Sequence, residues 1–294
     1  DLFANCMKSF LICHRGALGD FILTWPSLFC LRKALPHHQF IGIGRTEYMR
    51  LAISFGLLDT YIDKESAGLP DFFCGKSIPE KIGSPHGAVL WLTEGQNVVD
   101  LLKRSASLPV VSITPFPDEQ THLAQYYCSI IQSHFPRTVP QDLSDCFPAR
   151  VAEGQYALIH PGSGSSGKNY SPQFYRVLAD KLRRHGYPET CFIFGHVEDE
   201  KLNAEDFAGE RIERPQDVEA LAGLLSGASL YIGNDSGVSH LSGFVGTPTI
   251  ALYKTTDQKR WGVLGKKVVH ISDANEESAM RKIQECLMDL RIKN

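Results

Sequence analysis

The stretch Tyr231-Ile-Gly-Asn-Asp-Ser-Gly-Val-Ser-His-Leu241 decides the fold class of this 294-residue chain. It begins with apolar residues typical of a buried strand, continues through a polar turn at residues 234–237, and ends in residues that favour a helix. Another apolar run follows at residues 249–253. The pattern predicts an alternating α/β unit whose polar turn lies at the carboxyl end of a strand, where open sheets bind ligands.

The helix expected from about Val238 has unpaired N–H groups and the positive end of its dipole at its start. Both favour an anion or an array of sugar hydroxyls. The polar residues just before the helix are therefore candidate ligand contacts. The alternative is that Asp235 or Ser236 is only an N-cap and Gly237 only a turn residue.

A second strand-loop-helix unit contains the loop His160-Pro-Gly-Ser-Gly-Ser-Ser-Gly-Lys-Asn169. Its glycines leave backbone amides accessible, its serines offer hydroxyls and Lys168 supplies a cation, a combination that suits a diphosphate. Asn169 follows the lysine, so the loop is not a Walker motif. The alternative is a surface loop with a solvated lysine.

The first half of the chain repeats the same order of elements. A strand at residues 9–13 precedes a glycine-bearing loop at 16–20, and an amphipathic helix is expected over 21–35. The loop is not G-x-G-x-x-G, and Arg45 comes where an acidic residue would follow the second strand. A dinucleotide fingerprint is therefore not indicated.

Residues 136–154 interrupt the regular pattern with three prolines and mixed polar residues, as an interdomain linker does. The two halves predict two doubly wound, Rossmann-like α/β domains facing a cleft, over residues 1–150 and 151–294. One option for the last helix is to pack back on the N-terminal domain.

The composition excludes several classes of protein. The net charge of −3 argues against binding nucleic acid through a basic face, and no apolar run approaches the length of a membrane span. The eight cysteines include no C-x-x-C pair, so neither a zinc site nor a disulfide framework is indicated. A cytoplasmic location is the default expectation.

Five blocks of sequence together resemble glycosyltransferase family 9, the ADP-heptose:lipopolysaccharide heptosyltransferases. In the order that the family has them, they are Gly16 to Pro26, His160-Pro-Gly-Ser-Gly with Lys168, Gly233 to Leu241, Gly246-Thr-Pro-Thr249, and Thr256-Asp257 through Arg260-Trp261-Gly262. They lie within residues 9–262, although residues 59–84 show no match. The resemblance implies a GT-B architecture, with an acceptor-binding N-terminal domain and a nucleotide-sugar-binding C-terminal domain.

The resemblance also implies an inverting sugar transfer that needs no metal and no other cofactor. The absence of an Asp-x-Asp motif from the sequence is consistent with this. Asp20 would accept the proton of the acceptor hydroxyl, although an N-cap role for the helix from Phe21 is the alternative. Lys168 would stabilise the departing diphosphate. The residues expected to bind the donor are Gly162, Ser163, Ser166, Lys168, Glu198, Asp235, Ser236, Gly237 and His240.

Two donor-site assignments leave alternatives open. One carboxylate among Glu198, Asp199 and Glu200 suits the ribose hydroxyls, but all three could form a solvated helix start. His240 is either a ligand contact or a packing residue. For an anionic sugar-lipid acceptor the candidates are Gly19, Arg15, Arg45 and Lys64.

The leading hypothesis is an inverting, metal-independent transferase that moves heptose from ADP-heptose to a lipopolysaccharide core acceptor. One alternative is a family member that uses another nucleotide sugar or another acceptor. A different alternative is a non-catalytic nucleotide-sugar-binding protein. The expected partners are the nucleotide-sugar donor and a lipid-linked or oligosaccharide acceptor, with no nucleic acid. Membrane contact would be peripheral at most, at the inner face of the inner membrane.

Overall fold

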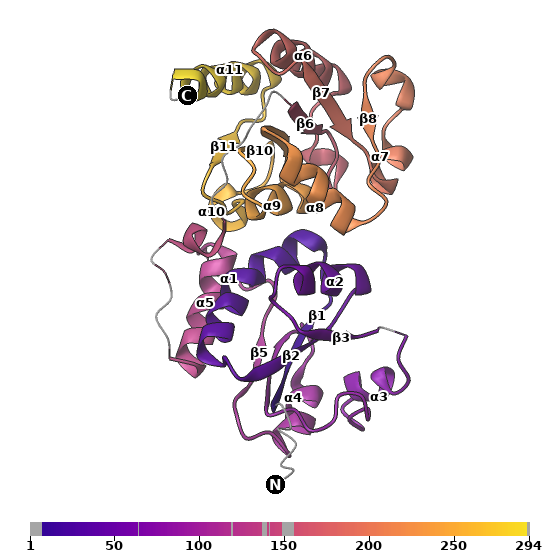
Figure 1. Ribbon diagram of the computed structural model, residues 1–294, viewed down its shortest axis with the longest axis vertical. Helices are drawn as coiled ribbons and strands as arrows, with labels where there is room; N and C mark the ends of the chain where they lie inside the picture. The colour runs from indigo at the N-terminus through magenta and orange to yellow at the C-terminus, as the bar shows by residue number, and fades with distance from the viewer. Residues whose placement is uncertain are drawn as a thin grey trace. The chain divides into compact units, whose positions relative to one another are not determined.

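The computed structural model describes residues 8–63, 65–118, 120–136, 140, 142–148 and 156–292. These residues form two compact units, which divide the chain into residues 1–119 with 123–141 and residues 120–122 with 142–294 (Figure 1). Each unit is a doubly wound α/β domain with its own parallel sheet.

The first unit has a five-stranded parallel sheet in the order β3-β2-β1-β4-β5. Its strands are β1 (Lys8–His14), β2 (His38–Ile43), β3 (Thr60–Ile62), β4 (Gly87–Trp91) and β5 (Val110–Ile113). Its helices are α1 (Leu18–Ala34), α2 (Thr46–Ser54), α3 (Leu69–Phe73), α4 (Gln96–Lys103) and α5 (Leu123–His134).

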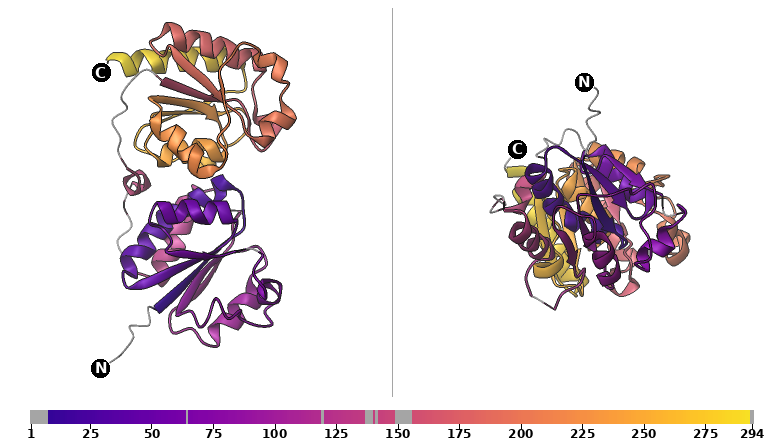
Figure 2. Two further views of the ribbon diagram at one scale, coloured as in Figure 1. Left: turned by 45° about the vertical axis from the view of Figure 1, so that its right-hand side comes forward. Right: turned by 90° about the horizontal axis from the view of Figure 1, so that it is seen from below.

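Helices cover both faces of this sheet (Figure 2). On one face Leu11 and Leu90 belong to an apolar cluster with Val98 of α4. On the other face the ring of Phe10 contacts Phe135, the residue after α5. Central parallel strands are buried on both faces, which is why β1 and β4 are continuous apolar runs instead of alternating ones.

The second unit has a six-stranded parallel sheet in the order β11-β10-β9-β6-β7-β8. Its strands are β6 (Tyr156–His160), β7 (Glu189–Ile193), β8 (Ile212–Glu213), β9 (Leu230–Asn234), β10 (Thr249–Tyr253) and β11 (Val268–Ser272). Its α-helices are α6 (Pro172–Arg184), α7 (His196–Lys201), α8 (Val218–Gly227), α9 (Gly237–Phe244), α10 (Gln258–Trp261) and α11 (Glu276–Ile292). Its 3-10 helices are η1 (Leu143–Cys146), η2 (Ser166–Lys168) and η3 (Ala204–Phe207).

Both sheets have the strand order of the Rossmann fold, in which the winding direction reverses between two neighbouring strands. The reversal lies between β1 and β4 in the first unit and between β6 and β9 in the second. The loops after these strands diverge and leave a crevice at the carboxyl edge of each sheet. The loop at 160–169 and the turn at 234–237 both lie at the second crevice.

Local sequence explains where several helices begin. The hydroxyl of Ser171 accepts the backbone N–H of Phe174 at 3.2 Å and Pro172 takes the first helical position, so α6 starts as its sequence predicts. Asp217 caps α8 by accepting the N–H of Ala220, and Leu230 already belongs to β9.

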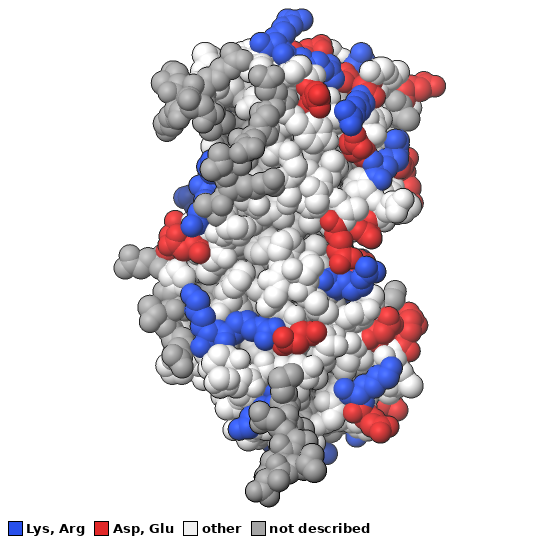
Figure 3. All heavy atoms as spheres, in the orientation of Figure 1, with Lys and Arg blue, Asp and Glu red and all other residues white. Residues whose placement is uncertain are grey.

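Helix α11 packs against β11 and α6 within the second unit. Its packing on the N-terminal domain, the option raised by the sequence, stays a prediction. The expected linker lies largely outside the described residues. None of the helices in the described ranges is long and apolar enough to cross a membrane. The face drawn in Figure 3 carries Lys and Arg interspersed with Asp and Glu, without an extended basic area.

Candidate functional site

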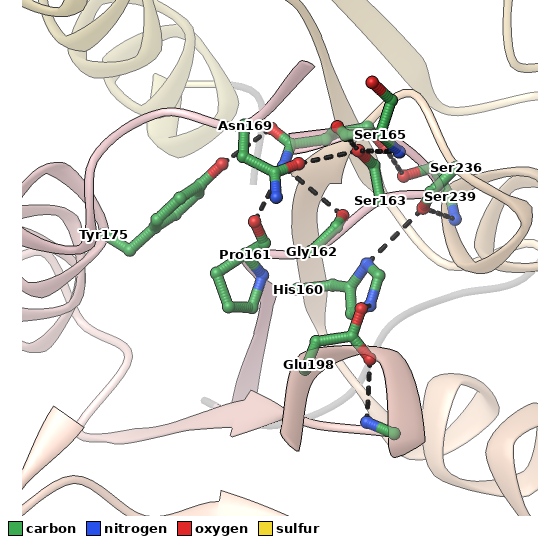
Figure 4. A network of polar contacts seen from close by, with 12 residues as sticks. His160, Pro161, Gly162, Ser163, Ser165, Asn169, Tyr175, Glu198, Ser236 and Ser239 are labelled. Carbon is green, nitrogen blue, oxygen red and sulfur yellow. Dashed lines mark hydrogen bonds and ion pairs between the residues drawn. The ribbon is translucent and has the colours of Figure 1, made fainter. Parts of the chain in front are cut away.

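The buried side chain of Asn234, the last residue of β9, holds both ends of the loop at 160–169. Its Nδ2 donates to the Pro161 carbonyl at 2.9 Å and to Asn169 Oδ1 at 3.1 Å. Its Oδ1 accepts the hydroxyl hydrogen of Tyr175 at 2.6 Å. Because Asn234 is fully buried, loss of any one partner would leave a polar group unsatisfied. The loop therefore has one fixed shape (Figure 4).

Two further contacts fix the loop. The hydroxyl of Ser163 lies 2.6 Å from Asn169 Oδ1 and 2.7 Å from the Ser165 carbonyl, and its single hydrogen serves one of them at a time. The amine of Lys254, just beyond β10, donates to the Asn169 carbonyl at 2.9 Å. Ser163 is buried, whereas Ser166 is exposed at the outer part of the loop.

The loop brings Lys168 against Asp235, as an ion pair with Nζ and Oδ2 2.8 Å apart. The other oxygen of Asp235 lies 3.7 Å from Nε2 of His240. Burial of Asp235 would raise the pKa of its carboxyl, but His240 and then Lys168 outweigh burial and lower this pKa to about 2. Asp235 thus contacts both Lys168 and His240, two further residues that the sequence places in the donor site.

Helix α9 begins beside this ion pair. Ser236 is its N-cap, and the serine hydroxyl accepts the N–H of Ser239 at 3.4 Å. Gly237 and Val238 follow as the first two helical residues. Their N–H groups have no acceptor within a helix and are available to an anion. The N-cap role considered for Ser236 is confirmed, and it is compatible with ligand binding.

Of the three neighbouring carboxylates on α7, only Glu198 lies at this crevice. Asp199 pairs with Arg214 at 3.1 Å on the surface, and Glu200 is exposed. Glu198 is buried, with Oε2 accepting the Gly195 N–H at 2.8 Å and Oε1 3.2 Å from Nε2 of His160.

Glycine is required at position 162 by this arrangement. A Cβ at Gly162 would lie 1.9 Å from Oε1 of Glu198, so the loop backbone and the carboxylate can approach only without a side chain there. Across the crevice, Nδ1 of His160 lies 3.4 Å from the Ser236 hydroxyl. Figure 4 shows Glu198, His160 and Ser236 in a row.

The first unit has its own pocket at the corresponding crevice, between the ends of β1 and β4. The pocket is about 560 Å³ in volume and is lined by Asp20 and Glu94, together with Phe73, Trp91 and Phe116. Carboxylates beside aromatic rings suit a sugar, whose hydroxyls need acceptors and whose C–H faces pack on rings.

Helix α1 starts at Leu18, three residues earlier than expected, so the expectation that Asp20 could be the N-cap of a helix from Phe21 is wrong. Asp20 is the third helical residue, and its Oδ2 accepts the N–H of Ala17 at 3.3 Å. The sequence misplaced this start because Ala17, the actual N-cap, has no capping side chain. Gly19 lies in the same turn.

A second pocket of about 590 Å³ adjoins the first. It is lined by Arg45 with apolar residues, and Arg15 and Phe73 line both pockets. The guanidinium of Arg15 lies 4.7 Å from the centre of the Phe73 ring, a cation–π contact. Lys64, the remaining acceptor candidate, lies outside the described residues.

Several residues at the second crevice received no role from the sequence. His160 and Asn234 lie in the two motifs that the sequence singled out. A single sequence does not show that His160 lies against Ser236 or that Asn234 binds the 160–169 loop. Tyr175 sits inside a helix and gave no signal. Lys254 follows the strand β10, and its position at the carboxyl end of a parallel strand is a signal that could have identified it. In the described parts of the chain, no three His, Cys, Asp or Glu side chains are grouped to hold a metal ion.

The chain is similar in sequence to known proteins of one family. The family model "Glycosyltransferase family 9 (heptosyltransferase)" matches residues 120–290, more than half of the chain. The chain is 27% identical over 153 residues to lipopolysaccharide heptosyltransferase 1 of Escherichia coli O18:K1:H7 (strain RS218 / NMEC). That match covers 51% of this chain and 44% of the relative, so it spans under half of the relative's length.

Solved structures agree over nearly the whole chain. A glycosyl transferase family 9 structure from Veillonella parvula DSM 2008 has a TM-score of 0.76 at 18% identity, covering 96% of this chain and 98% of that one. The E. coli heptosyltransferase WaaC with ADP has a TM-score of 0.73 at 18% identity, covering 95% and 99%. The expected GT-B fold is confirmed.

A more distant match bears on metal use. The iron-containing dodecameric glycosyltransferase TibC from enterotoxigenic E. coli H10407 has a TM-score of 0.56 at 16% identity. The match covers 90% of this chain and 62% of TibC.

The lowered pKa of Asp235 makes stability depend on pH. A carboxyl whose pKa is lower when folded stabilises the fold above its unfolded pKa, near 4, and loses this contribution as the pH falls to about 2. Chemical unfolding should therefore show that Asp235→Asn costs on the order of 2 kcal/mol at pH 5, with the difference from wild type shrinking toward pH 2. Lys168→Met should raise the pKa of Asp235, so the contribution of Asp235 to stability should be lost at a higher pH. A difference that stays constant with pH would contradict the assignment.

Proposed function

The chain belongs to glycosyltransferase family 9, and on that premise we propose that it transfers heptose from ADP-heptose to a lipopolysaccharide core acceptor. The transfer would invert the anomeric centre and need no metal ion. The observation that carries the proposal is the grouping of Lys168, Asp235 and the first turn of α9 at the crevice of the second sheet. This grouping offers a cation and free N–H donors at one place, as a diphosphate requires.

Lys168 is proposed to bind the diphosphate while it stays in contact with Asp235. An ammonium group has three hydrogens, so the amine can bridge the Asp235 carboxylate and a phosphate oxygen. Asp235 thereby holds the amine in place before the donor arrives. As the bond from sugar to phosphate breaks, negative charge grows on the diphosphate, and the amine and the N–H groups of Gly237 and Val238 stabilise that charge.

The remaining donor-site residues take supporting roles in the proposal. Exposed Ser166 offers a hydroxyl to the phosphates or the ribose, whereas buried Ser163 and Gly162 shape the loop. Glu198 is proposed to accept from a ribose hydroxyl, through lone pairs not used by His160 and Gly195. His240 supports Asp235.

We propose that the pocket of the first unit binds the acceptor sugar, with Asp20 as the general base. Its carboxylate would take the proton from the acceptor hydroxyl as that hydroxyl attacks the anomeric carbon. Arg15 and Arg45 in the adjoining pocket, with Gly19 beside Asp20, would bind an anionic part of the acceptor. A cytoplasmic enzyme with peripheral membrane contact at most, and with no nucleic-acid partner, fits this chemistry.

The alternative within the family is a different nucleotide sugar or a different acceptor. The match to the family model begins at residue 120 and leaves most of the first unit, the proposed acceptor-binding domain, outside it, which favours this alternative for the acceptor. The non-catalytic alternative has no support, since the family consists of transferases.

Lys168→Ala should weaken ADP binding by about 10- to 150-fold in calorimetry, because a charge-assisted hydrogen bond contributes about 1.5–3 kcal/mol. Lys267→Ala removes an exposed lysine just before β11 and serves as the matched control, with unchanged affinity expected. Equal ADP affinity in Lys168→Ala and wild type would place the lysine outside the diphosphate site.

Asp20→Asn should lower kcat for heptose transfer by about 100-fold or more, because an amide fills the same space but cannot take the proton. ADP release from ADP-heptose and heptose-deficient lipopolysaccharide gives the rate, and calorimetry should show unchanged ADP binding. Exposed Asp100→Asn is the control. Full activity in Asp20→Asn would remove this residue from the role of base.

Transfer should survive excess EDTA, and added Mg²⁺ should change the rate only as far as ionic screening does. The physical reason is that Lys168 and helix N–H groups replace a cation at the diphosphate. Loss of activity in EDTA, restored by Mg²⁺, Mn²⁺ or iron, would show that the enzyme depends on a metal.

A further inference from the structure

A row of three side chains connects α7, the end of β6 and the start of α9 (Figure 4). Oε1 of Glu198 lies 3.2 Å from Nε2 of His160, and Nδ1 of His160 lies 3.4 Å from the Ser236 hydroxyl. His160 and Glu198 are almost completely buried. Since β6 lies between β7 and β9, the imidazole joins the loops on both sides of its own strand.

The hydrogen positions in this row follow from counting donors and acceptors. Burial would raise the pKa of Glu198, but the hydrogen bonds from His160 and the Gly195 amide lower it, so the carboxylate is ionised at neutral pH. It can only accept, and therefore Nε2 of His160 carries a hydrogen. In the neutral imidazole Nδ1 is then an acceptor, and it takes the hydroxyl hydrogen of Ser236.

A diphosphate at the start of α9 changes this balance. Phosphate oxygens accept hydrogen bonds, and Ser236 has only one hydrogen to give. If the hydroxyl turns to the phosphate, Nδ1 of His160 loses its hydrogen-bond donor. An unsatisfied acceptor on a buried ring destabilises the complex. A proton on Nδ1 restores the hydrogen bond, because an imidazolium donates from both nitrogens, to Glu198 and to the Ser236 oxygen.

We propose that binding of the donor diphosphate takes up one proton from solvent at Nδ1 of His160. In this step Glu198 and His160 act through Ser236 and turn its hydroxyl toward the phosphate, which is separate from the contact of Glu198 with the ribose. The inference rests on the proposed function in one respect, that a nucleoside diphosphate binds at the start of α9.

The charges around His160 favour a proton on its ring more strongly when the diphosphate is bound. Glu198 of α7 supplies one negative charge. Tyr231 of β9 is buried, which raises the pKa of its hydroxyl and keeps it neutral. Asp235 is balanced by Lys168 and faces His240 of α9. The new negative charge of the diphosphate therefore favours an imidazolium beside it.

Calorimetry measures this proton directly. ADP is titrated above pH 7.5, where a terminal phosphate has lost its last proton, in buffers of different ionisation enthalpy. The wild-type protein should take up close to one proton, or a clear fraction of one, per ADP. Its affinity should fall by up to about tenfold per pH unit as the pH rises, because protons are bound on association.

Glu198→Gln keeps the shape of the row but reverses the direction of its hydrogen bonds. The amide oxygen still accepts the Gly195 N–H, the amide NH₂ donates to Nε2, and Nδ1 of His160 carries the hydrogen from the start. This variant should bind ADP without proton uptake and with a flat pH profile. His160→Phe should lose the uptake as well, and if it does not fold, Glu198→Gln carries the test.

His185→Gln is the matched control, since the ring of His185 at the end of α6 bonds the Lys181 carbonyl of its own helix and is not part of the row. Its proton uptake should equal that of wild type. ADP binding by wild type without proton uptake would overturn the inference. Uptake that persists in Glu198→Gln would also overturn it, because another group would then bind the proton. Failure of the wild type to bind ADP would instead remove the proposed function.

Discussion

The carboxamide of Asn234 makes the hydrogen bonds on which the shape of the 160–169 loop depends. It is fully buried, and it binds groups at both ends of the 160–169 loop while it accepts from Tyr175 of α6. A loop with six consecutive glycines and serines, residues 162–167, has many conformations when free, and the contacts of Asn234 favour one of them. In that conformation Lys168 meets Asp235.

The sequence predicted the fold class and the positions of the polar loops at 160–169 and 234–237, because both follow from local patterns. Apolar runs separated by glycine-bearing polar loops fix the order of strands and helices, and parallel strands place those loops at one edge of the sheet. Lys168, Asp235 and Ser236 could therefore be expected to lie near one another. The short elements β3 and α3 were missed, because such brief segments depend on the surrounding packing more than on their own pattern.

Contacts between distant segments could not be predicted from one sequence. The choice of Glu198 over Asp199 and Glu200 depends on which face of a short helix turns toward His160, and no local signal states that. The start of α1 was misplaced because Ala17 carries no capping group, which moves Asp20 from the expected cap into the first turn. The first difference concerns a side chain whose partner lies on another loop. The second concerns a helix whose N-cap residue has no capping side chain.

We propose that the start of α9 and Lys168 form a diphosphate site that is held in place before the ligand arrives. A crystal structure of the ADP complex would show this site. We expect diphosphate oxygens about 3 Å from Nζ of Lys168 and from the N–H groups of Gly237 and Val238, with the 160–169 loop unchanged. A diphosphate bound elsewhere, with Lys168 still paired only to Asp235, would contradict it.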